Sequence, residues 1–300
     1  MIVCVSPTPA VDRLHQVSGP VVVGEIHRPT RVVAVAGGKG LNAARAAAAL
    51  GAHVRAVAPL GGGSGAWIEA ELAAAGIEVR SVRTQAEPRV CVSVAGEGQE
   101  LTEFYEGAPE LLADEWDALV EVVRAAADGA GWVTLSGSLP PGSPADGMAT
   151  LIGAAREAGA RVALDARDDD LRAGVLGEPD LIKINEHEAR DLLGSTDVAA
   201  LCPPGGVACI TRGADGLELA TDGVRLRARP PVRGRYPVGC GDVTLGALVT
   251  ARDAGADWHE AVALAVGAAA AAAEVPGAGV LDPARARMLA ADVEVSAIRS

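Results

Sequence analysis

Hydrophobic positions along the chain fall into two alternating patterns. Short runs of consecutive apolar residues predict buried strands, and longer stretches with helical spacing follow most of them. Apolar strands that alternate with helices are typical of a mostly parallel sheet with helices on both faces, which binds ligands at the carboxyl ends of its strands. The predicted strands are 2–5, 32–36, 54–58, 90–95, 132–136, 161–165, 181–184 and 207–211, and the predicted helices are 41–50, 66–75, 115–127, 145–158, 186–193, 243–252, 259–273 and 283–290.

Two regions interrupt this alternation. Residues 13–36 and 88–108 carry strand-type patterns without an intervening helix. They predict a small antiparallel sheet, for which two interpretations remain open: a lid over the active site, or an edge extension of the main sheet. In either case we expect one α/β domain over residues 1–300.

The composition requires a core of small aliphatic side chains. Hydrophobic residues make up 49% of the sequence and aromatic residues only 2%, so Ala, Val and Leu must fill the interior. The most apolar stretch, 261–273, is about half the ~20 residues that a membrane span needs and is bounded by Glu260 and Glu274. We expect it to be a buried helix. The N-terminus lacks the basic start and long apolar stretch of a signal peptide, which favours a cytoplasmic protein.

Charge and cysteine content exclude several classes of function. The formal net charge of −13 makes nucleic acid and anionic membranes poor partners. An anionic substrate would need a local group of cations, so Lys and Arg residues near glycine-rich segments are of special interest. The five cysteines form no CxxC pair, which predicts reduced thiols and no zinc site.

The first glycine-rich segment, residues 37–42, follows a predicted strand and opens an alanine-rich helix. Glycines permit close approach of a ligand, the helix N-terminus favours an anion, and Lys39 adds positive charge. Gly38, Gly40 and Ala43 also fit a dinucleotide-binding pattern, but that pattern needs an acidic residue at the end of the next strand, and none occurs before Glu69. No P-loop motif occurs. A tight turn without a ligand is the remaining alternative.

The second glycine-rich segment, Gly239-Cys240-Gly241-Asp242, leads into another predicted helix. Backbone N–H groups at a helix start can hold phosphoryl oxygens. A carboxylate in the first turn can accept the proton of an attacking hydroxyl, which is most of what phosphoryl transfer requires. Alternatively, Asp242 is only a helix cap. Together with the first segment, we favour Asp242 as a base.

Four motifs in order resemble those of the ribokinase-like, or PfkB-type, carbohydrate kinases. Residues 37–52 (GGKGLNAARAAAALGA) resemble the first signature of the family, and residues 239–249 (GCGDVTLGALV) resemble the second, usually GAGD. KINEHE at 183–188 and TRGADG at 211–216 resemble its K-P-N-x-x-E and nucleotide-loop elements. The resemblance covers nearly the whole chain. It implies a ribokinase-like three-layer α/β/α sandwich with a β lid, and ATP and Mg²⁺ as cofactors.

The resemblance implies a role for each matching residue, with Asp242 as the catalytic base. Asp12 by itself would be read as a turn residue, and the resemblance reverses that interpretation. The other implied roles are Gly239, Cys240 and Gly241 as the anion hole; Asn185 and Glu188 for Mg²⁺, through water; Lys183, Asn185, Thr211, Gly213 and Gly216 at ATP; and Asp12, Gly37, Gly38 and Asn42 at the sugar hydroxyls.

Further features resemble the branch of 1-phosphofructokinases and tagatose-6-phosphate kinases. They are PTPAVDR at 7–13, SGSLPPG at 136–142 and the lysine within GGKG. A phosphosugar carries a dianion that needs several positive donors. The residues expected to supply donors are Lys39, Arg89, Ser138 and Arg28, the last from the lid or from a partner's lid.

Some positions depart from the family pattern, and these leave the exact sugar open. Cys240 replaces the usual Ala, Ile184 replaces Pro, and ARDDD at 166–170 replaces the usual continuation after Asp165. The sequence therefore predicts an ATP-dependent kinase for a phosphorylated ketohexose such as fructose 1-phosphate or tagatose 6-phosphate. The alternatives are a kinase for a free sugar or nucleoside, and a non-catalytic, ligand-sensing member of the fold. A homodimer through the lid is also expected.

Overall fold

The computed structural model describes residues 1–221 and 223–298. Among these residues, ten strands form one large sheet with the order β14-β13-β12-β11-β10-β9-β8-β1-β4-β5. The sheet is parallel from β11 to β5 and antiparallel from β11 to β14. Its strands are β1 (Ile2–Val5), β4 (Val54–Pro59), β5 (Glu78–Val82), β8 (Trp132–Ser136), β9 (Arg161–Asp165), β10 (Leu181–Asn185), β11 (Val207–Thr211), β12 (Leu217–Thr221), β13 (Val224–Ala228) and β14 (Val295–Ala297).

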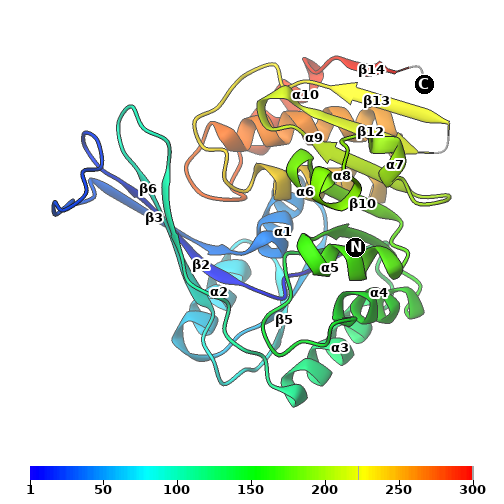
Figure 1. Ribbon diagram of the computed structural model, residues 1–300, viewed down its shortest axis with the longest axis horizontal. Helices are drawn as coiled ribbons and strands as arrows, with labels where there is room; N and C mark the ends of the chain where they lie inside the picture. The colour runs from blue at the N-terminus through cyan, green and yellow to red at the C-terminus, as the bar shows by residue number, and fades with distance from the viewer. Residues whose placement is uncertain (222, 299–300) are drawn as a thin grey trace.

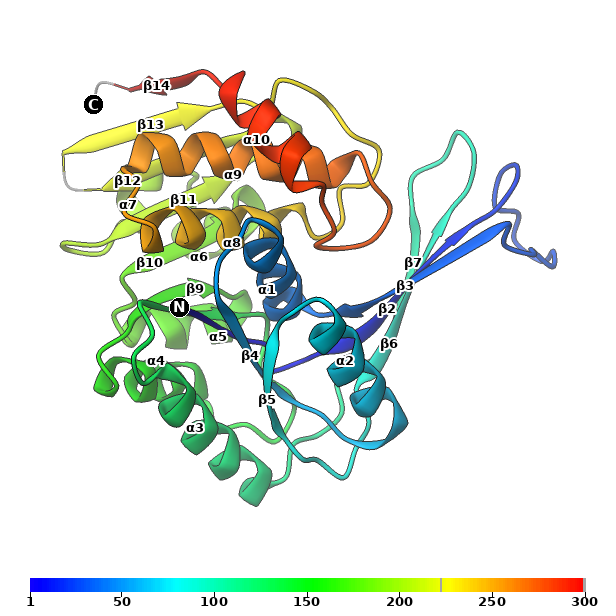
Figure 2. The ribbon, with the colours of Figure 1, turned by 180° about the vertical axis from the view of Figure 1, so that it is seen from behind.

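Helices cover both faces of the large sheet, and each face has its own hydrophobic cluster (Figures 1 and 2). The predicted three-layer α/β/α sandwich is therefore confirmed. One face carries α1 (Lys39–Ala49), α2 (Gly62–Ala74), α8 (Cys240–Asp253), α9 (Trp258–Ala273) and α10 (Pro283–Ala291). The other carries α3 (Ala113–Ala127), α4 (Gly147–Glu157), α5 (Asp168–Leu176), α6 (Glu186–Leu193) and α7 (Val198–Leu201).

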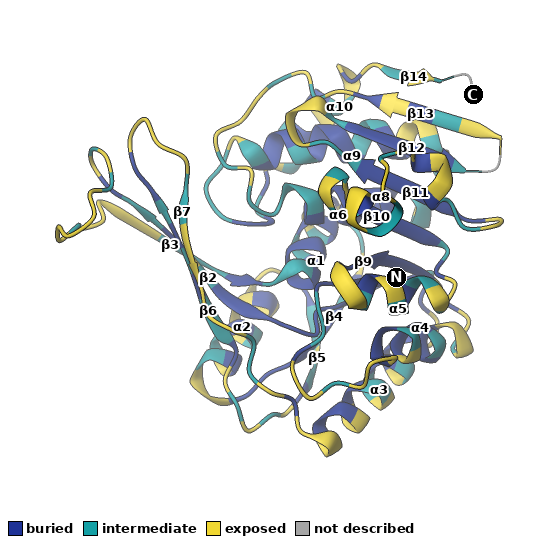
Figure 3. Ribbon diagram, in the orientation of Figure 1, coloured by how far each residue is buried: buried dark blue, intermediate teal, exposed yellow. Residues whose placement is uncertain are grey.

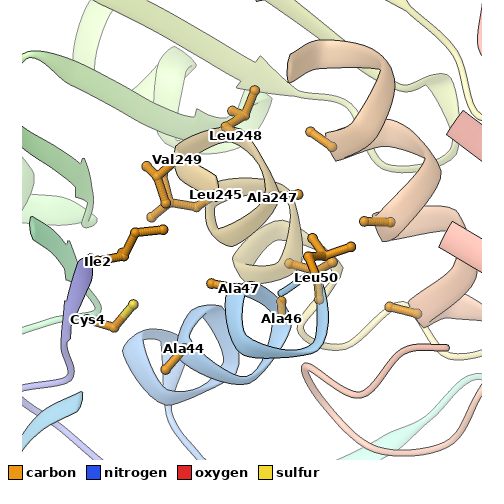
Figure 4. Close-up of a cluster of buried hydrophobic side chains, with 14 of the residues drawn as sticks. Ile2, Cys4, Ala44, Ala46, Ala47, Leu50, Leu245, Ala247, Leu248 and Val249 are labelled. Atoms are coloured by element: carbon orange, nitrogen blue, oxygen red, sulfur yellow. The ribbon is translucent and has the colours of Figure 1, made fainter. Parts of the chain in front are cut away.

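Small side chains allow α1 and α8 to pack closely against each other. Figure 4 shows the alanines of α1 facing the apolar side chains of α8 and the start of β1. A Cβ atom on Gly246 would lie 2.6 Å from the carbonyl oxygen of Ala43, so the two backbones are almost in contact. This packing brings the two glycine-rich helix starts, which are 200 residues apart in sequence, to the same edge of the sheet.

The second sheet projects from the body of the molecule (Figures 1 and 3). It is not an extension of the main sheet, so that interpretation is wrong. Its β2 and β6 run parallel and its other pairs antiparallel, which corrects the prediction of a purely antiparallel sheet. The strand order is β3-β2-β6-β7, with β2 (Ala10–Gln16), β3 (Arg31–Gly37), β6 (Arg89–Ala95) and β7 (Thr102–Tyr105).

The predicted elements are present, and the structure adds others. Strands 132–136, 161–165 and 207–211 and helix 186–193 have the predicted bounds. The apolar stretch 261–273 lies within α9 and contributes to the core, as expected, and no helix in the described part of the chain is long and apolar enough to cross a membrane. The strand β7 lies within the predicted β-rich region 88–108, and β2 overlaps the region 13–36. The elements that the pattern did not predict are β5, β12, β13, β14, α5 and α7.

Candidate active site

A cleft of about 980 Å³ lies where the parallel strands end, bordered also by the projecting sheet. It is the place where a doubly wound sheet binds its ligands. Gly37 and Arg28 do not line the cleft: Gly37 ends β3 beneath Asp12, and Arg28 lies in the exposed β2–β3 loop. The predicted residues that line it are Asp12, Gly38, Lys39, Asn42, Arg89, Ser138, Lys183, Asn185, Glu188, Thr211, Gly213, Gly216, Gly239, Cys240, Gly241 and Asp242.

The N-terminus of α8 opens into the cleft without a side-chain cap. Gly239 precedes the helix with φ 80°, a conformation that glycine adopts at little cost. The Cys240 N–H donates to the carbonyl of Pro237 at 3.2 Å, so it is not a free donor. The N–H groups of Gly241 and Asp242 lie in the first turn, where a helix offers them no acceptor. An anion at this helix start would therefore meet the N–H groups of Gly241 and Asp242, while the N–H of Cys240 is already hydrogen-bonded.

Asp242 is buried at the same helix start, with 6% of its surface exposed. Its Oδ2 accepts a hydrogen bond from Asn42 Nδ2 at 2.8 Å. Burial, and then the nearby negative charge of Asp165, raise the pKa of Asp242 to about 6, although Lys39 and Lys183 oppose the rise. Asp242 does not cap the helix with its side chain, because the cap position is Gly239. A carboxylate with this pKa is suited to accept a proton near neutral pH.

A fully buried carboxylate, Asp165, lies at the end of β9 and joins two lysines. Lys39 Nζ donates to its Oδ1 at 2.9 Å, and Lys183 Nζ donates to its Oδ2 at 2.6 Å. Burial alone would raise the pKa of Asp165, but the two ammonium groups outweigh it and lower the pKa. Likewise, burial alone would lower the pKa of Lys39, but Asp165, Asp242 and Glu188 raise it. Lys39 is thus held as a cation beside the helix start, and the hydrogen bond to Asp165 fixes the Lys183 side chain there.

The absence of a side chain at Gly241 leaves room for the ammonium group of Lys183. A Cβ atom on Gly241 would lie 2.9 Å from Lys183 Nζ. A larger residue would push the ammonium group away from the start of α8. The glycine requirement here arises from close approach to a cation rather than from backbone conformation.

The side of the cleft formed by β10, α6 and β11 contains the predicted nucleotide residues. Asn185 Oδ1 accepts from the N–H groups of His187 and Glu188, and Glu188 Oε2 accepts from the Asn185 N–H, which forms a capping box at α6. The other carboxylate oxygen of Glu188 lies 3.6 Å from Lys39 Nζ. Thr211 ends β11, and Gly213 begins a short 3-10 turn.

Whether these residues suit Mg²⁺ depends on which of their side-chain oxygen atoms are not already used in hydrogen bonds within the protein. The described residues contain no group of three His, Cys, Asp or Glu side chains that could enclose a metal ion. Mg²⁺ is commonly bound by one or two carboxylates, with waters and substrate phosphates as the other ligands. Glu188 provides one carboxylate oxygen that is not used in the capping box, which fits the predicted contact through water.

The opposite side of the cleft contains Asp12, Arg89 and Ser138. A Cβ atom on Gly37 would lie 2.1 Å from Asp12 Cγ, so this glycine makes room for the carboxylate. Burial raises the pKa of Asp12, with Arg45 and Arg89 opposing the rise. Arg89 Nη1 donates to the carbonyl of Glu106 at 3.2 Å.

Comparison with known proteins decides the family. The pfkB family carbohydrate kinase profile matches residues 2–285. The chain is 31% identical to a 1-phosphofructokinase from Haloferax volcanii over an alignment of 311 residues, which covers 100% of both proteins. The chain belongs to the pfkB family of carbohydrate kinases. It is a sugar kinase of the phosphofructokinase type, as predicted.

Solved structures support the same assignment of fold. Phosphofructokinase-2 from Escherichia coli in complex with potassium matches with a TM-score of 0.89 and 27% identity, over 97% of this chain and 98% of that one. Ribokinase from Arabidopsis thaliana complexed with ribose and ATP matches with a TM-score of 0.73 and 23% identity, over 96% and 98% of the two chains. The ribokinase-like fold is thereby confirmed.

Several residues in the cleft of this sugar kinase were not predicted from the sequence. Arg167 lines the cleft, and its Nε donates to Ser138 Oγ at 3.2 Å. Tyr105 lines it from β7, and Arg45 lies behind Asn42. Asp165 was noted only as a strand end, because it follows an apolar run that shows no sign of its two lysine partners. ARDDD at 166–170 was noted only as a departure from the family. It directly follows the predicted strand 161–165, as SGSLPPG follows 132–136, so the ends of these two strands were a usable indication of Arg167.

Proposed function

We propose that this chain is an ATP-dependent kinase that phosphorylates a hydroxyl group of a phosphorylated ketohexose, of the fructose 1-phosphate or tagatose 6-phosphate type. The observation that carries the proposal is the position of Asp242. It is buried at an uncapped helix start, beside two free N–H groups and close to Lys39 and Lys183. A base, an anion hole and cations at one point are the components that phosphoryl transfer needs. The relationship to a 1-phosphofructokinase supports the substrate class.

Each component has a distinct task in the proposed reaction. The Asp242 carboxylate takes the proton of the attacking primary hydroxyl as the oxygen–phosphorus bond forms and the bond from the γ-phosphorus to the β-bridging oxygen breaks. The N–H groups of Gly241 and Asp242 receive the oxygens of the transferred group. Lys183, held by Asp165 at 2.6 Å, stabilises the charge on the leaving phosphate side.

ATP is proposed to lie along the side of the cleft formed by β10, α6 and β11. Mg²⁺, when bound, neutralises charge on the phosphates, and Asn185 and Glu188 would hold it through water. The small or glycine residues of the 211–216 loop leave room for the nucleotide base and ribose. The chain residues proposed to contact ATP are Lys183, Asn185, Thr211, Gly213 and Gly216.

The sugar is proposed to bind on the opposite side, beneath the projecting sheet, which would act as a lid. Asp12, Gly38 and Asn42 would hold sugar hydroxyls, since a carboxylate and an amide can bridge neighbouring hydroxyls. Lys39, Arg89 and Ser138 would bind the phosphate already on the sugar. On a chain with a net charge of −13, the presence of these cations in one cleft favours an anionic substrate over a free sugar or nucleoside.

A substrate panel separates this proposal from its alternatives. We would measure ADP release with phosphorylated ketohexoses, free sugars and nucleosides, for the natural chain and for Arg89→Gln. We expect turnover with a phosphoketohexose, and a KM that Arg89→Gln raises roughly 10- to 100-fold, because a charged hydrogen bond is worth about 1.5–3 kcal/mol. Arg80→Gln, an exposed arginine on β5, is the matched control. Preference for an uncharged acceptor with no effect of Arg89 would favour the free-sugar alternative, and no turnover with any acceptor would favour the ligand-sensing one.

The projecting sheet is also proposed as the contact surface of a homodimer. Large apolar side chains are exposed on its strands, at Val32 and Phe104, and on the loop between β2 and β3, at Val23 and Ile26. Pairing two such sheets would cover these residues and could bring Arg28 of one subunit near the cleft of the other. Sedimentation of the natural chain and of Phe104→Glu tests this. We expect the natural chain to be a dimer and the Phe104→Glu variant to be a monomer, and a monomeric natural chain would contradict the proposal.

A further inference from the structure

Arg45 lies behind Asn42 on α1, three residues further along the helix. Its Nη2 donates to Asn42 Oδ1 at 2.8 Å and also to the carbonyl of Ala278. Its Nε and Nη1 atoms are buried and have no hydrogen-bond partner. Burial lowers the pKa of Arg45 to about 10, so the guanidinium remains charged at neutral pH. A half-buried guanidinium with two buried nitrogens and so few partners needs an explanation beyond packing.

The hydrogen-bonding chemistry of arginine fixes the orientation of the neighbouring amide. A guanidinium can only donate, so Asn42 must present its oxygen to Arg45. The Asn42 NH₂ group then faces Asp242 Oδ2, at 2.8 Å. If the amide turned over, its oxygen would face a carboxylate oxygen and its NH₂ group would face the guanidinium. Both contacts would then be repulsive.

We propose that Arg45 is a positioning residue that fixes the Asn42 amide so that it donates to Asp242 and keeps this carboxylate ionised. Ala278, on the loop after α9, anchors the guanidinium from the other side. The proposal rests on the proposed function only in assigning Asp242 as the base. It explains why an alanine-rich helix carries an arginine whose Nε and Nη1 atoms are buried.

Other charged groups lie near Asp242, but the described residues show no hydrogen bond from them to its carboxylate. Lys39 and Lys183 lie close to Asp242, but their hydrogen bonds go to Asp165. Asn42 is the side chain that donates to the Asp242 carboxylate among the described residues. The groups that face Asp242 are Lys39, Asn42 and Arg45 from α1, Asp165 from β9, Lys183 from β10 and Cys240 from α8 itself, with Asp12 of β2 facing Arg45.

Removing the guanidinium should therefore release the amide. In Arg45→Met, Asn42 can turn its oxygen towards Asp242 and accept a hydrogen bond from the protonated carboxyl group. The protonated form is then favoured, and the midpoint of Asp242 ionisation rises by roughly one pH unit. Arg45→Gln, which is also neutral, is a second variant in case the first does not fold. In Arg45→Lys the ammonium group can still only donate hydrogen bonds. The midpoint of Asp242 ionisation should therefore lie close to that of the natural chain.

The experiment follows Asp242 ionisation without using activity. The unfolding free energy of each chain is compared with that of its Asp242→Asn counterpart between pH 4 and pH 8, which gives the midpoint through linkage. The series is natural chain, Arg45→Met, Asn42→Ala and the double variant. Arg252→Met is the matched control, because Arg252 also lies on a helix, donates to a backbone carbonyl and has a buried Nε without a partner.

The expected result is a rise in midpoint for Arg45→Met and for Asn42→Ala, with no further rise in the double variant. Arg252→Met should lower stability and leave the midpoint unchanged. Additive shifts would overturn the proposal, because Arg45 would then act on Asp242 by charge alone, and so would an unchanged midpoint in Arg45→Met. If Asp242→Asn proved fully active, the proposed function would fail, but these midpoints would still measure the coupling.

Discussion

The inner part of the cleft and its rim are built in different ways. In the inner part, Asp165 accepts hydrogen bonds from Lys39 and Lys183, and Asp242 accepts one from Asn42. These bonds are 2.6–2.9 Å long, and all five residues except Lys39 are buried. The rim contains Arg89, Ser138 and Arg167, which are half-buried or exposed and make contacts of 3.2 Å. The inner part is preorganised, so it can set the chemistry. The rim has free donors, so it can set which substrate binds.

Asp242→Asn should cause the largest effect, and in opposite directions on activity and stability. Loss of a general base lowers kcat by about 10²- to 10⁴-fold. Because the pKa of Asp242 is raised in the folded state, from 3.8 to about 6, ionising it above pH 6 opposes folding. The neutral amide should therefore be more stable at pH 8 by on the order of 1–3 kcal/mol, and equal near pH 4. Urea unfolding at both pH values measures this, and a less stable variant at pH 8 would contradict it.

Asp165→Asn should break the inner part by removing the carboxylate that accepts hydrogen bonds from Lys39 and Lys183. Removing one partner of a buried ion pair costs about 3–5 kcal/mol of unfolding free energy. Since Asp165 also raises the pKa of Asp242, the acid limb of kcat/KM should move to lower pH in this variant. The exposed pair of Asp197 and Arg225 supplies the control, because Asp197→Asn should cost less than about 1 kcal/mol. Equal costs for the two variants would refute the distinction.

Arg167→Gln tests the rim. Its side chain is 62% exposed, so the loss of one partly solvated charged contact should raise KM for the phosphosugar about 10-fold. We expect kcat to change little, because the reacting groups lie elsewhere. Steady-state kinetics on this variant and on Arg172→Gln, an exposed arginine of α5, provide the comparison. A fall in kcat at unchanged KM would place Arg167 with the inner part instead.

Cys240→Ala should have the smallest effect, although Cys240 lies at the start of α8, beside the proposed anion hole. Its N–H is already bonded to Pro237, and its thiol faces the carbonyl of Tyr236. Burial, and then the charge of Asp242, raise the pKa of the thiol to about 12, so very little thiolate exists at pH 7. We expect activity within about threefold of the natural chain, in line with a conservative change. Mass spectrometry after iodoacetamide treatment should show slow labelling of Cys240, and rapid labelling would contradict this.

The sequence allowed the framework and much of the inner part to be predicted. Apolar runs such as 132–136 and 161–165 have the length and composition of buried parallel strands, and both have the predicted bounds. The glycine-rich motifs at the starts of α1 and α8 allowed Lys39 and Asp242 to be predicted as site residues. What could not be predicted is how side chains pair across the fold. Asp165 contacts Lys39 at a separation of 126 residues, and no local pattern encodes that contact.

Other elements were missed for local reasons. The triple aspartate at 168–170 is typical of a loop, yet it forms the first turn of α5, where negative charge is favourable. The strands β12 and β13 belong to the antiparallel part of the sheet and carry polar residues among their apolar ones, unlike the continuous apolar runs of its centre. Arg45 resembles a surface arginine in a polar helix face, because its burial depends on α8 and on the loop at Ala278.

The most direct test of the account is the pH dependence of kcat/KM for a phosphoketohexose, measured for the natural chain and for Asp242→Asn. Proton transfer to Asp242 predicts that log kcat/KM of the natural chain falls with unit slope below about pH 6, in line with the raised pKa of this carboxyl group. It also predicts that the weak residual rate of Asp242→Asn lacks this limb. The same limb in both chains, or a natural rate in the variant, would show that another group takes the proton.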